Sequence, residues 1–372
     1  MGRAGYDEVV LLTGYPSFAA RKLCEELVRG PERTLVHCVV RAKFAAEAQS
    51  AKDELPLDQR QRIVLVDGDA ASMDLGLSGA EFKSLAREVD VIHHAAQVSY
   101  MGTDRATAEH VNVGGAREIL ELGAACASLK CLVFHSTAHV SGDRTGLVRE
   151  EELAAGQGFR NVVEETKARA EKMMRAKMDK LPICVVRPTM VVGDSHTGEV
   201  DRFDGPYLLI LLIVTSPADF TLPLLGRGDA LLHVVPIDYV VRAARALGRH
   251  PKAPGRTFHL ADPEPLTVRR CFELVAKAGG RRMPRGFIPA NLTKALLRTP
   301  GIDRFAKSPR ALLDAIATPV RYSTAATDEL LAGSGVTCPP FADYVERLVE
   351  YVQVRLREKR ARRDADVVDP LT

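Results

Sequence analysis

The first apolar stretch of the chain is followed by a glycine and several small residues, in a pattern that could bind a phosphate group. Residues 9–12 are apolar, the run breaks at Gly14, and helical periodicity begins near residue 18. Unpaired backbone N–H groups and the helix dipole favour negative charge at such a helix N-terminus. Ser17 and Ala20 stand where the usual dinucleotide fingerprint carries its second and third glycines, although an ordinary strand-to-helix turn shares the pattern. The residues predicted to surround a pyrophosphate are Thr13, Gly14, Pro16, Ser17 and Phe18.

Two cations follow the second apolar run, residues 34–40. Arg41 comes directly after this run and Lys43 two residues later, where a site selective for NAD would carry a carboxylate that binds the ribose hydroxyls. A guanidinium there suits the 2′-phosphate of NADP. We therefore predict NADP(H) as the cofactor in preference to NAD(H), although Arg41 could also simply begin a loop.

Acidic, small and hydroxyl-bearing residues follow the next three apolar runs. The third run ends in the acidic segment that contains Asp69, the fourth ends at Ala95 and Ala96, and the fifth ends at Ser136 and Thr137. Small side chains let a flat nucleotide lie against the backbone, whereas bulky ones would block it. If these runs are neighbouring strands, their carboxyl ends place all of these residues along one edge of a sheet, with a hydroxyl at the same rim.

Strands must alternate with helices to bring these residues together, and the sequence has that alternation. Short β-type apolar runs alternate with segments of helical periodicity through the first half of the chain. The pattern is typical of α/β proteins, in which helices cover both faces of a doubly wound parallel sheet. Ligands bind such sheets at the carboxyl ends of the strands, near the switch in strand order. The six predicted strands are residues 9–12, 34–40, 63–66, 89–94, 131–136 and 183–187.

Length and composition are typical of a globular protein with a large core. The chain has 372 residues, and its 51 Lys and Arg against 48 Asp and Glu give a formal charge of +3, too balanced to favour nucleic acid. Its longest apolar run, residues 207–214, is shorter than the ~20 residues of a membrane-spanning helix.

Seven cysteines are scattered without a Cys-x-x-Cys pair, which favours buried thiols in a reducing compartment and no metal site. We expect a cytoplasmic protein whose basic segment 357–363 is a solvated helix end, with an anionic membrane surface as the alternative partner.

Eight short motifs occur between residues 7 and 350. They are TGYPSFAAR from Thr13, DGD from Asp67, HHAA from His93, VNVGG from Val111, HSTAHVSGD from His135, RPTMVVGDSHTGE from Arg187, VPIDYVV from Val235 and FHLADPEPLT from Phe258. Together they resemble the extended short-chain dehydrogenase/reductases, and within these the branch that contains thioester reductase, aminoadipate reductase and fatty acyl-CoA reductase domains. The resemblance implies a Rossmann-type domain that binds NADP(H), with Asp69 toward the adenine and with Pro188 and Thr189 toward the nicotinamide.

The resemblance also implies how a carbonyl group would be reduced. As hydride reaches the carbonyl carbon, negative charge develops on the oxygen, and in this family a tyrosine hydroxyl donates the proton. A lysine one helical turn later lowers the pKa of the tyrosine and binds the ribose, while a serine or threonine orients the carbonyl. By this resemblance Lys167 is the lysine and Thr137 supplies the hydroxyl, but Val163 stands in the place of the tyrosine.

The valine at the tyrosine position leaves three interpretations open. In the first, another group or a water donates the proton, and Tyr100 and His139 are the candidates by their positions in the sequence. Alternatively, Tyr100 only packs against the nicotinamide and His139 only lines the substrate cleft. In the second, the chain keeps the nucleotide pocket without reductase activity and acts as a sensor, a scaffold or a partner subunit. In the third, the same cofactor pocket serves epimerisation or dehydration.

The second half of the chain is predicted to complete the sheet and to form a small, mostly helical cap. We place the NADP-binding core in residues 1–195 and the remaining region in residues 196–372, with the two interleaved. Apolar periodicity predicts helices over residues 266–278 and 341–352, and a mostly helical segment over residues 283–313. The resemblance implies that the cap covers the nicotinamide end and that its apolar lining suits an acyl chain. The predicted function is NADP(H)-dependent reduction of an acyl thioester or related carbonyl, with the thioester carried by coenzyme A or by a separate carrier protein.

Overall fold

Two units interleave along the chain of this computed structural model. The described residues are 5–100, 102–203, 205–216, 224–225, 228–283, 286–288 and 319–367. The first unit comprises Met1–Thr189, Tyr239–Ala261 and Val320–Thr337. The second unit comprises Met190–Asp238, Asp262–Pro319 and Cys338–Thr372.

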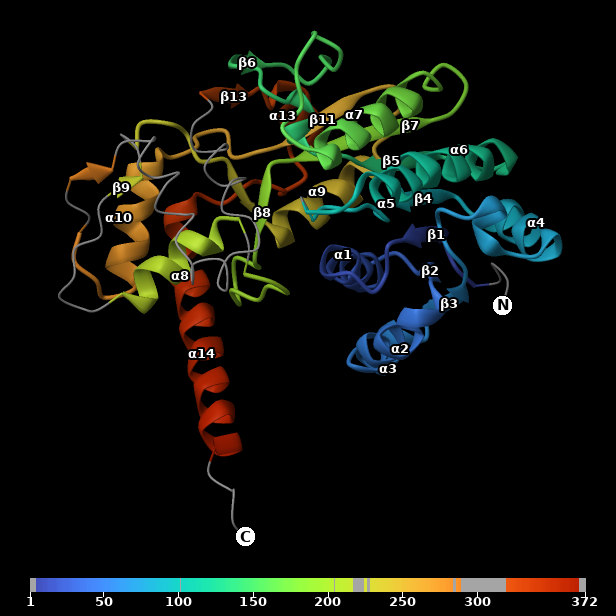
Figure 1. Ribbon diagram of the computed structural model, residues 1–372. Coiled ribbons are helices and arrows are strands. Elements are labelled where there is room, and N and C mark those ends of the chain that lie inside the picture. The colour runs from blue at the N-terminus through green and yellow to red at the C-terminus, as the bar shows by residue number, and fades with distance from the viewer. Residues whose placement is uncertain are drawn as a thin grey trace. The chain divides into compact units, whose positions relative to one another are not determined.

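Seven parallel strands form the sheet of the first unit, one more than the sequence predicts (Figure 1). The strands are β1 (Glu8–Thr13), β2 (Thr34–Val40), β3 (Ile63–Asp67), β4 (Val91–His94), β5 (Cys131–His135), β7 (Ile183–Pro188) and β11 (Thr257–Leu260). Their order is β11-β7-β5-β4-β1-β2-β3, and all neighbouring pairs are parallel. Since β1 lies between β2 and β4, the strand order switches there, and ligands are expected at the carboxyl ends of β1 and β4.

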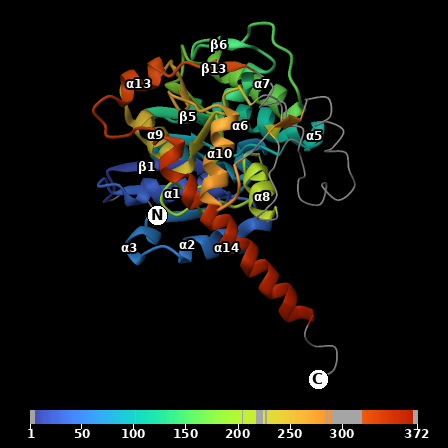
Figure 2. The same cartoon turned by 90° about the vertical axis from the view of Figure 1, so that its left-hand side faces the viewer.

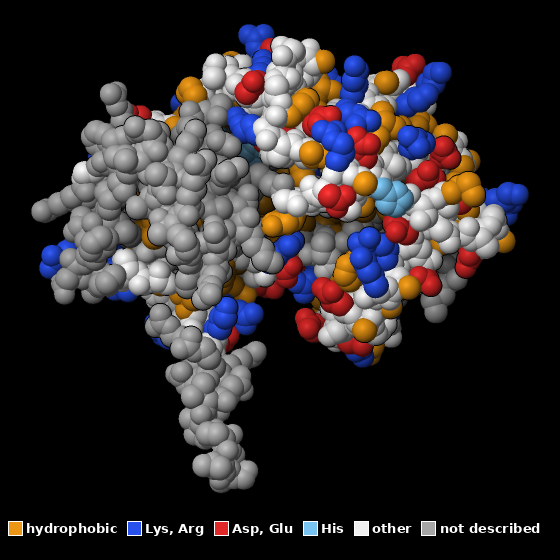
Figure 3. Space-filling view, in the orientation of Figure 1, with side chains coloured by type: hydrophobic (Ala, Val, Ile, Leu, Met, Phe, Trp, Pro, Cys, Tyr) orange, Lys and Arg blue, Asp and Glu red, His pale blue; other side chains and the backbone are white. Residues whose placement is uncertain are grey.

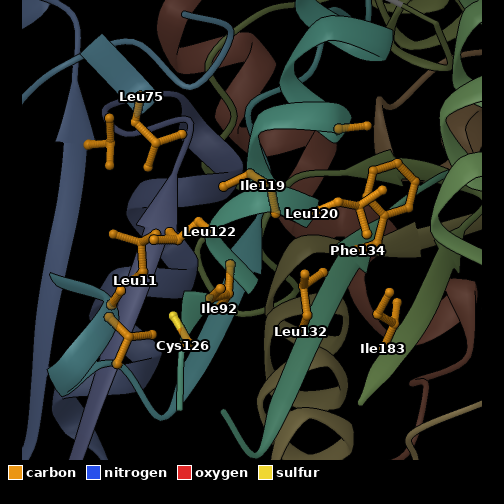
Figure 4. Close-up of a cluster of buried hydrophobic side chains, with 14 of the residues drawn as sticks. Leu11, Leu75, Ile92, Ile119, Leu120, Leu122, Cys126, Leu132, Phe134 and Ile183 are labelled. Carbon is orange, nitrogen blue, oxygen red and sulfur yellow. The ribbon is translucent and has the colours of Figure 1, made fainter. Parts of the chain in front are cut away.

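One face of this sheet is covered by α4 (Gly79–Glu88), α6 (Gly115–Ala125) and α7 (Val162–Arg175). Side chains from alternate positions of the strands meet Ile119 and Leu122 of α6 in a buried core (Figure 4). Each fully buried Leu, Ile or Phe side chain contributes about 1.5–3 kcal/mol to the stability of such a core. The strand residues in this core include Val9, Leu11, Leu35, Ile92, Leu132, Phe134, Ile183 and Val185.

The opposite face is covered by α1 (Phe18–Arg29) and α9 (Ile237–Arg249). Cys24 of α1 lies beside Cys38 of β2, with the sulfur atoms 3.8 Å apart. A Cβ on Gly248 would lie 2.9 Å from a valine methyl group of β5, so this glycine lets α9 approach the sheet closely. All seven cysteines are free thiols, and six of them are buried.

Shorter elements complete the first unit. The helices are α2 (Ala45–Asp53), α3 (Leu57–Arg60), α5 (Arg105–Ala108) and α13 (Ala325–Leu331). Short 3-10 helical turns occur at Ala42–Phe44, Met73–Gly76 and Ala138–Ser141, and Glu109–Gly114 is a π-helical segment. Two further strands, β6 (Gly146–Val148) and β13 (Val320–Tyr322), form a separate parallel pair.

The second unit is built mainly from α8 (Tyr207–Thr215), α10 (Val268–Ala278) and α14 (Phe341–Val367). The predicted helices over residues 266–278 and 341–352 are confirmed, and α14 continues beyond α8 and α10 (Figures 1 and 2). Its strands are β8 (Met190–Val192) with β10 (Val234–Pro236), and β9 (Leu224–Leu225) with β12 (Phe287–Ile288). The buried residues that join these helices include Tyr207, Ile210, Phe272, Tyr344 and Leu348.

One helical prediction for the second unit is only partly within the described structure. Residues 284–285 and 289–313 of the predicted segment 283–313 lie outside the described residues. The prediction is wrong for Phe287–Ile288, which form β12 because they pair with β9.

The charge of the surface is mixed. Figure 3 shows acidic and basic side chains interspersed over the coloured surface, as the near balance of 51 basic and 48 acidic residues leads one to expect. None of the helices within the described ranges combines the length and the apolar composition that crossing a bilayer requires.

Candidate active site

The turn between β1 and α1 contains a glycine that another residue could not replace without strain. Gly14 has a φ angle of +92°, which L side chains rarely adopt. A Cβ on Gly14 would lie 2.8 Å from the carbonyl group of Ala95 and 2.9 Å from the nitrogen of Ala96. The loop after β1 therefore touches the loop after β4 backbone to backbone. The structure thus brings three predicted cofactor-binding residues together at the switch in strand order.

Hydrogen bonds of Thr13 connect the loop after β1 to His94 and to the loop after β4. The Oγ1 atom of Thr13 accepts a hydrogen bond from the N–H of Ala96 at 3.1 Å and lies 2.9 Å from Nδ1 of His94. Burial lowers the pKa of His94 to about 3, so the ring is neutral at pH 7 and an unprotonated Nδ1 can accept from the Thr13 hydroxyl. The hydroxyl of Thr13, which is fully buried, is thereby used to hold the loops.

The first turn of α1 leaves backbone N–H groups open to a ligand. The helix begins at Phe18 after Ser17 as N-cap, and the Ser17 side chain makes no capping hydrogen bond. Because the first N–H groups of a helix have no partner within it, the amides after Ser17 can bind phosphate oxygens. Pro16 is buried in the turn. Ala20 is fully buried, which permits the close helix packing that the third glycine of the fingerprint usually provides.

Two cations follow β2 and a carboxylate follows β3. After β2, the guanidinium carbon of Arg41 and Nζ of Lys43 each lie 5.0 Å from the ring centroid of Phe44. After β3, Oδ1 of Asp69 accepts a hydrogen bond from the N–H of Ala71 at 3.0 Å. Since β1, β2 and β3 are consecutive parallel neighbours, these groups follow the carboxyl ends of strands at the same edge as the Gly14 loop.

One face of α7 carries three buried residues at successive turns. Val163, Lys167 and Glu171 are 6 %, 8 % and 0 % exposed, and their spacing of four residues places them on one side of the helix. Asn161 caps the helix by accepting a hydrogen bond from the N–H of Glu164 at 2.9 Å. Burial lowers the pKa of Lys167 to about 8. Among the described residues Lys167 has no hydrogen bond or ion pair, so its amine is available to a ligand.

The hydroxyl of Thr137 lies between the ends of β5 and β7. It donates a hydrogen bond to the carbonyl oxygen of Pro188 at 3.4 Å and accepts one from the N–H of His139 at 3.3 Å. Thr137 thereby caps the turn Ala138–Ser141, on which His139 is half-buried. The predicted residues Thr137, His139 and Pro188 are thus close neighbours.

The ring of Tyr100 packs against the backbone of its own loop. Atoms of its ring are within 2.7–2.8 Å of the position that a Cβ on Gly102 would take, so the ring packs against this glycine. The side chain is 38 % exposed. Of the two proton donors suggested by the sequence, His139 is the one whose backbone N–H is hydrogen-bonded to Thr137 within the described structure.

Asn112 connects the loop after β4 to α7, a role that the sequence analysis missed. Its Nδ2 donates a hydrogen bond to Oγ1 of Thr166 at 2.9 Å, and its Oδ1 accepts one from the N–H of Val98 at 2.8 Å. Asn112 is fully buried, and Thr166 directly precedes Lys167. The available signal was the single polar residue within the VNVGG motif.

Two further side chains present buried polar atoms without a partner. Thr189 Oγ1, after β7, and both amide atoms of Gln97, after β4, are buried and make no hydrogen bond within the described structure. Leaving such a group unsatisfied costs about 1–3 kcal/mol, which a bound polar ligand would recover. They are therefore candidate contacts for a polar ligand at the carboxyl ends of β4 and β7. The sequence analysis named Thr189 but missed Gln97.

A buried polar network lies next to Thr137. Ser136 donates a hydrogen bond from Oγ to Oε2 of Glu171 at 2.6 Å, and Nε of Arg187 lies 3.0 Å from each oxygen of that carboxylate. Nη1 of Arg187 lies 3.3 Å from both the carbonyl oxygen of Glu150 and Nε2 of His259. The network joins β5, α7, β7 and β11 and so fixes the elements that carry Thr137 and Lys167.

The sequence is similar to that of one protein family and of several known reductases. Residues 12–244 match the family model described as "Male sterility protein", an NAD-binding family. The fatty acyl-CoA reductase wat of Drosophila melanogaster is 27 % identical over 281 residues, covering 64 % of this chain and 54 % of the relative. The glycine betaine reductase ATRR of Emericella nidulans is 28 % identical over 288 residues, covering 72 % of this chain and 22 % of that protein. The chain thus spans about half the length of the first relative and a smaller part of the second.

Solved structures share the fold. The terminal R domain of the myxalamid PKS-NRPS pathway superimposes with a TM-score of 0.79 at 26 % identity, covering 95 % of this chain and 92 % of the R domain. UDP-glucuronic acid 4-epimerase from Bacillus cereus, in complex with NAD, has a TM-score of 0.67 at 18 % identity, covering 93 % and 96 % of the two chains. At that identity the second similarity is one of fold alone.

Proposed function

The chain belongs to the male sterility protein family, in the thioester reductase-like branch of the extended short-chain dehydrogenase/reductases, and on this premise we propose that it is an NADP(H)-dependent reductase of an acyl thioester or related carbonyl. The family and the reductases among its relatives support an oxidoreductase that uses a nicotinamide cofactor. The observation that carries the finer proposal is Lys167, buried and unpaired within the described structure, at the position of the family's lysine.

The residues at the carboxyl edge of the sheet fit this cofactor. Gly14 and the N-terminus of α1 would hold the pyrophosphate, and Arg41 with Lys43 would hold the 2′-phosphate. The unpaired amide of Gln97, after β4, and hydroxyl of Thr189, after β7, support a polar ligand at this edge of the sheet. The bound cofactor supplies the hydride.

The chain's own groups orient the carbonyl and manage its charge. Thr137 offers a hydroxyl between the ends of β5 and β7, where it can bind the carbonyl oxygen. Lys167 offers a cation that binds the ribose and favours the negative charge developing on that oxygen. A substrate could arrive as a coenzyme A thioester or on a separate carrier protein.

The second candidate is a catalytically impaired NADP-binding protein that serves as a sensor, scaffold or partner subunit. It is favoured by Val163, a buried apolar side chain at the position of the family's proton donor. Both candidates use the same cofactor residues, and they differ only in turnover.

NADPH binding followed by turnover tests the proposal. Wild type and Val163→Tyr would be titrated with NADPH by fluorescence, and NADPH oxidation would then be followed after addition of a long-chain acyl-CoA or of the same acyl group on a carrier protein. Binding with turnover in wild type supports the reductase. Binding with turnover only in Val163→Tyr supports the impaired protein, and failure to bind NADPH contradicts both.

Arg41→Asp is expected to weaken NADPH binding by about 10–100-fold relative to NADH, because a charge-assisted hydrogen bond is worth about 1.5–3 kcal/mol. Binding constants for both cofactors measure the change. Arg117→Asp, on the exposed surface of α6, is the control for the altered net charge and should leave both constants unchanged. An unaltered preference in Arg41→Asp would remove Arg41 from the 2′-phosphate site.

A further inference from the structure

The buried face of α7 carries one proton-bearing group that the fold does not use. Val163 has no proton to give. Glu171, two turns further on, is bound by Arg187 and Ser136. Lys167 lies between them, is 8 % exposed, and forms no hydrogen bond or ion pair with any residue that the structure describes. Its ammonium protons are therefore free for transfer.

We propose that Lys167 itself donates the proton to the substrate carbonyl oxygen, in place of the missing tyrosine, an inference that rests on the proposed reductase function. Lys167 is one helical turn from Val163 on the same face, so both positions border the same space. A valine side chain is shorter than a tyrosine side chain and does not reach the volume that a phenol would occupy. The flexible four-carbon stem of lysine lets Nζ extend into that volume.

The surroundings of Lys167 suit a general acid. Burial lowers the pKa of its ammonium group to about 8. A catalytic acid is most effective when its pKa lies near the working pH, and an ordinary lysine, with a pKa of about 10.4, is too weak an acid. At pH 7 the Lys167 ammonium remains protonated and yet releases its proton more readily than an exposed lysine.

The step balances in atoms and electrons. The thioester carbonyl carbon gains a hydride, with its two electrons, from NADPH, which is oxidised to NADP⁺. The carbonyl oxygen takes a proton from Nζ of Lys167, which becomes a neutral amine. The resulting hemithioacetal collapses to an aldehyde as its C–S bond breaks, and its hydroxyl proton passes to the departing sulfur. Water then returns a proton to Nζ.

Other charged groups on and around α7 are largely paired. The pairs are Arg105 with Glu165, Glu109 with Arg169, Arg160 with Glu164, and Arg187 with Glu171. The remaining titratable groups on the elements packed against this helix are His110, Arg117, Glu118, Glu121, His139 and Cys184. His135 at the end of β5 is neutral at pH 7, because burial and the charge of Lys167 lower its pKa to about 4. Arginines, glutamates and ordinary histidines do not titrate near pH 8. The hydrogen bond with Cys131 and burial raise the pKa of Cys184 well above its usual value, so Lys167 is the group to test near pH 8.

Lys167→Arg separates proton donation from charge, since arginine keeps the cation and the hydrogen-bond donors but does not release a proton below pH 12. We expect kcat to fall by about 10²–10⁴-fold, the usual contribution of a general acid, while the Kd for NADPH stays within about threefold. Lys172→Arg, on the exposed side of the same helix, is the matched control and should change neither quantity.

Two further measurements distinguish proton donation by Lys167 from a purely structural role of this residue. In wild type, kcat should fall as pH rises above about 8, and in Val163→Tyr this decline should move toward the phenol pKa of about 10. Independently of turnover, the pH dependence of acetylation by acetic anhydride, read by mass spectrometry on the protein without cofactor, should give a midpoint of about 8 for Lys167, well below the ordinary lysine value of about 10.4.

The outcomes separate this proposal from the reductase function. Wild-type turnover that persists within about threefold in Lys167→Arg overturns the proton donor and leaves the reductase standing. An acetylation midpoint for Lys167 near the ordinary lysine value overturns the donor whatever the turnover. A wild type that binds NADPH and reduces no acyl thioester overturns the reductase, and the donor with it.

Discussion

Glu171→Ala is expected to destabilise the protein by about 3–5 kcal/mol, because it leaves a buried guanidinium without its carboxylate. Glu171 is 0 % and Arg187 1 % exposed, and Nε of the arginine lies 3.0 Å from each carboxylate oxygen. The substitution also removes the acceptor of the 2.6 Å hydrogen bond from Ser136. The neighbouring carbonyl oxygen of Glu150, 3.3 Å from Nη1, cannot neutralise the charge. Urea denaturation of wild type and variant measures the difference.

Glu165→Ala is the matched control on the same helix. Glu165 also pairs with an arginine, Arg105, at 2.9 Å, but both side chains are partly or largely exposed, at 32 % and 54 %. Exposed ion pairs contribute about 0–1 kcal/mol, so the loss should be small. Equal losses in the two variants would contradict the assignment of a structural role to the buried network.

The sheet could be predicted because most of its strands are buried on both faces. Such strands have nearly continuous apolar sequences, as in β1 and β2, and the glycine turn after β1 marks where the first one stops. β11 differs because it has only four residues, and Thr257 and His259 interrupt its apolar pattern. His259 is fully buried because it serves the network around Arg187, and periodicity alone could not show this.

The candidate site was predictable where its geometry is local. The i, i+4 spacing of Val163 and Lys167 places both on one helix face in any α-helix, so their relation could be stated from the sequence. The contact of Asn112 with Thr166 joins residues 54 positions apart, and the contact of Glu150 with Thr327 joins residues 177 positions apart. Such pairs depend on how the chain crosses the sheet and have no local signal.

Acidification from pH 7 to pH 5 is expected to destabilise the protein through four histidines of the sheet whose pKa is lowered by burial. They are His37, His93, His94 and His135. Burial lowers the pKa to about 4 for His37 and His135 and to about 3 for His94, and it also lowers the pKa of His93. The unfolded chain, with histidine pKa values of about 6.5, therefore binds more protons as the pH falls below that value. The stabilisation is complete above about pH 6.5 and is lost toward pH 4, by up to about 1.4 kcal/mol per pH unit for each histidine.

His94→Gln tests this pH dependence of stability at the histidine that also contacts Thr13. Protonation of its Nδ1 would remove the acceptor for the Thr13 hydroxyl in the 2.9 Å contact between these side chains, and so disturb the two loops that meet at Gly14. Without this group, the slope of unfolding free energy against pH between about 6.5 and 4.5 should decrease by about 1.4 kcal/mol per pH unit, whatever the stability at pH 7. His196→Gln, whose side chain is 78 % exposed, should leave the slope unchanged. Buried carboxyls whose pKa is raised, such as that of Glu150, oppose the trend equally in both variants. An equal slope for His94→Gln and wild type would therefore mean that His94 is not held neutral by the fold.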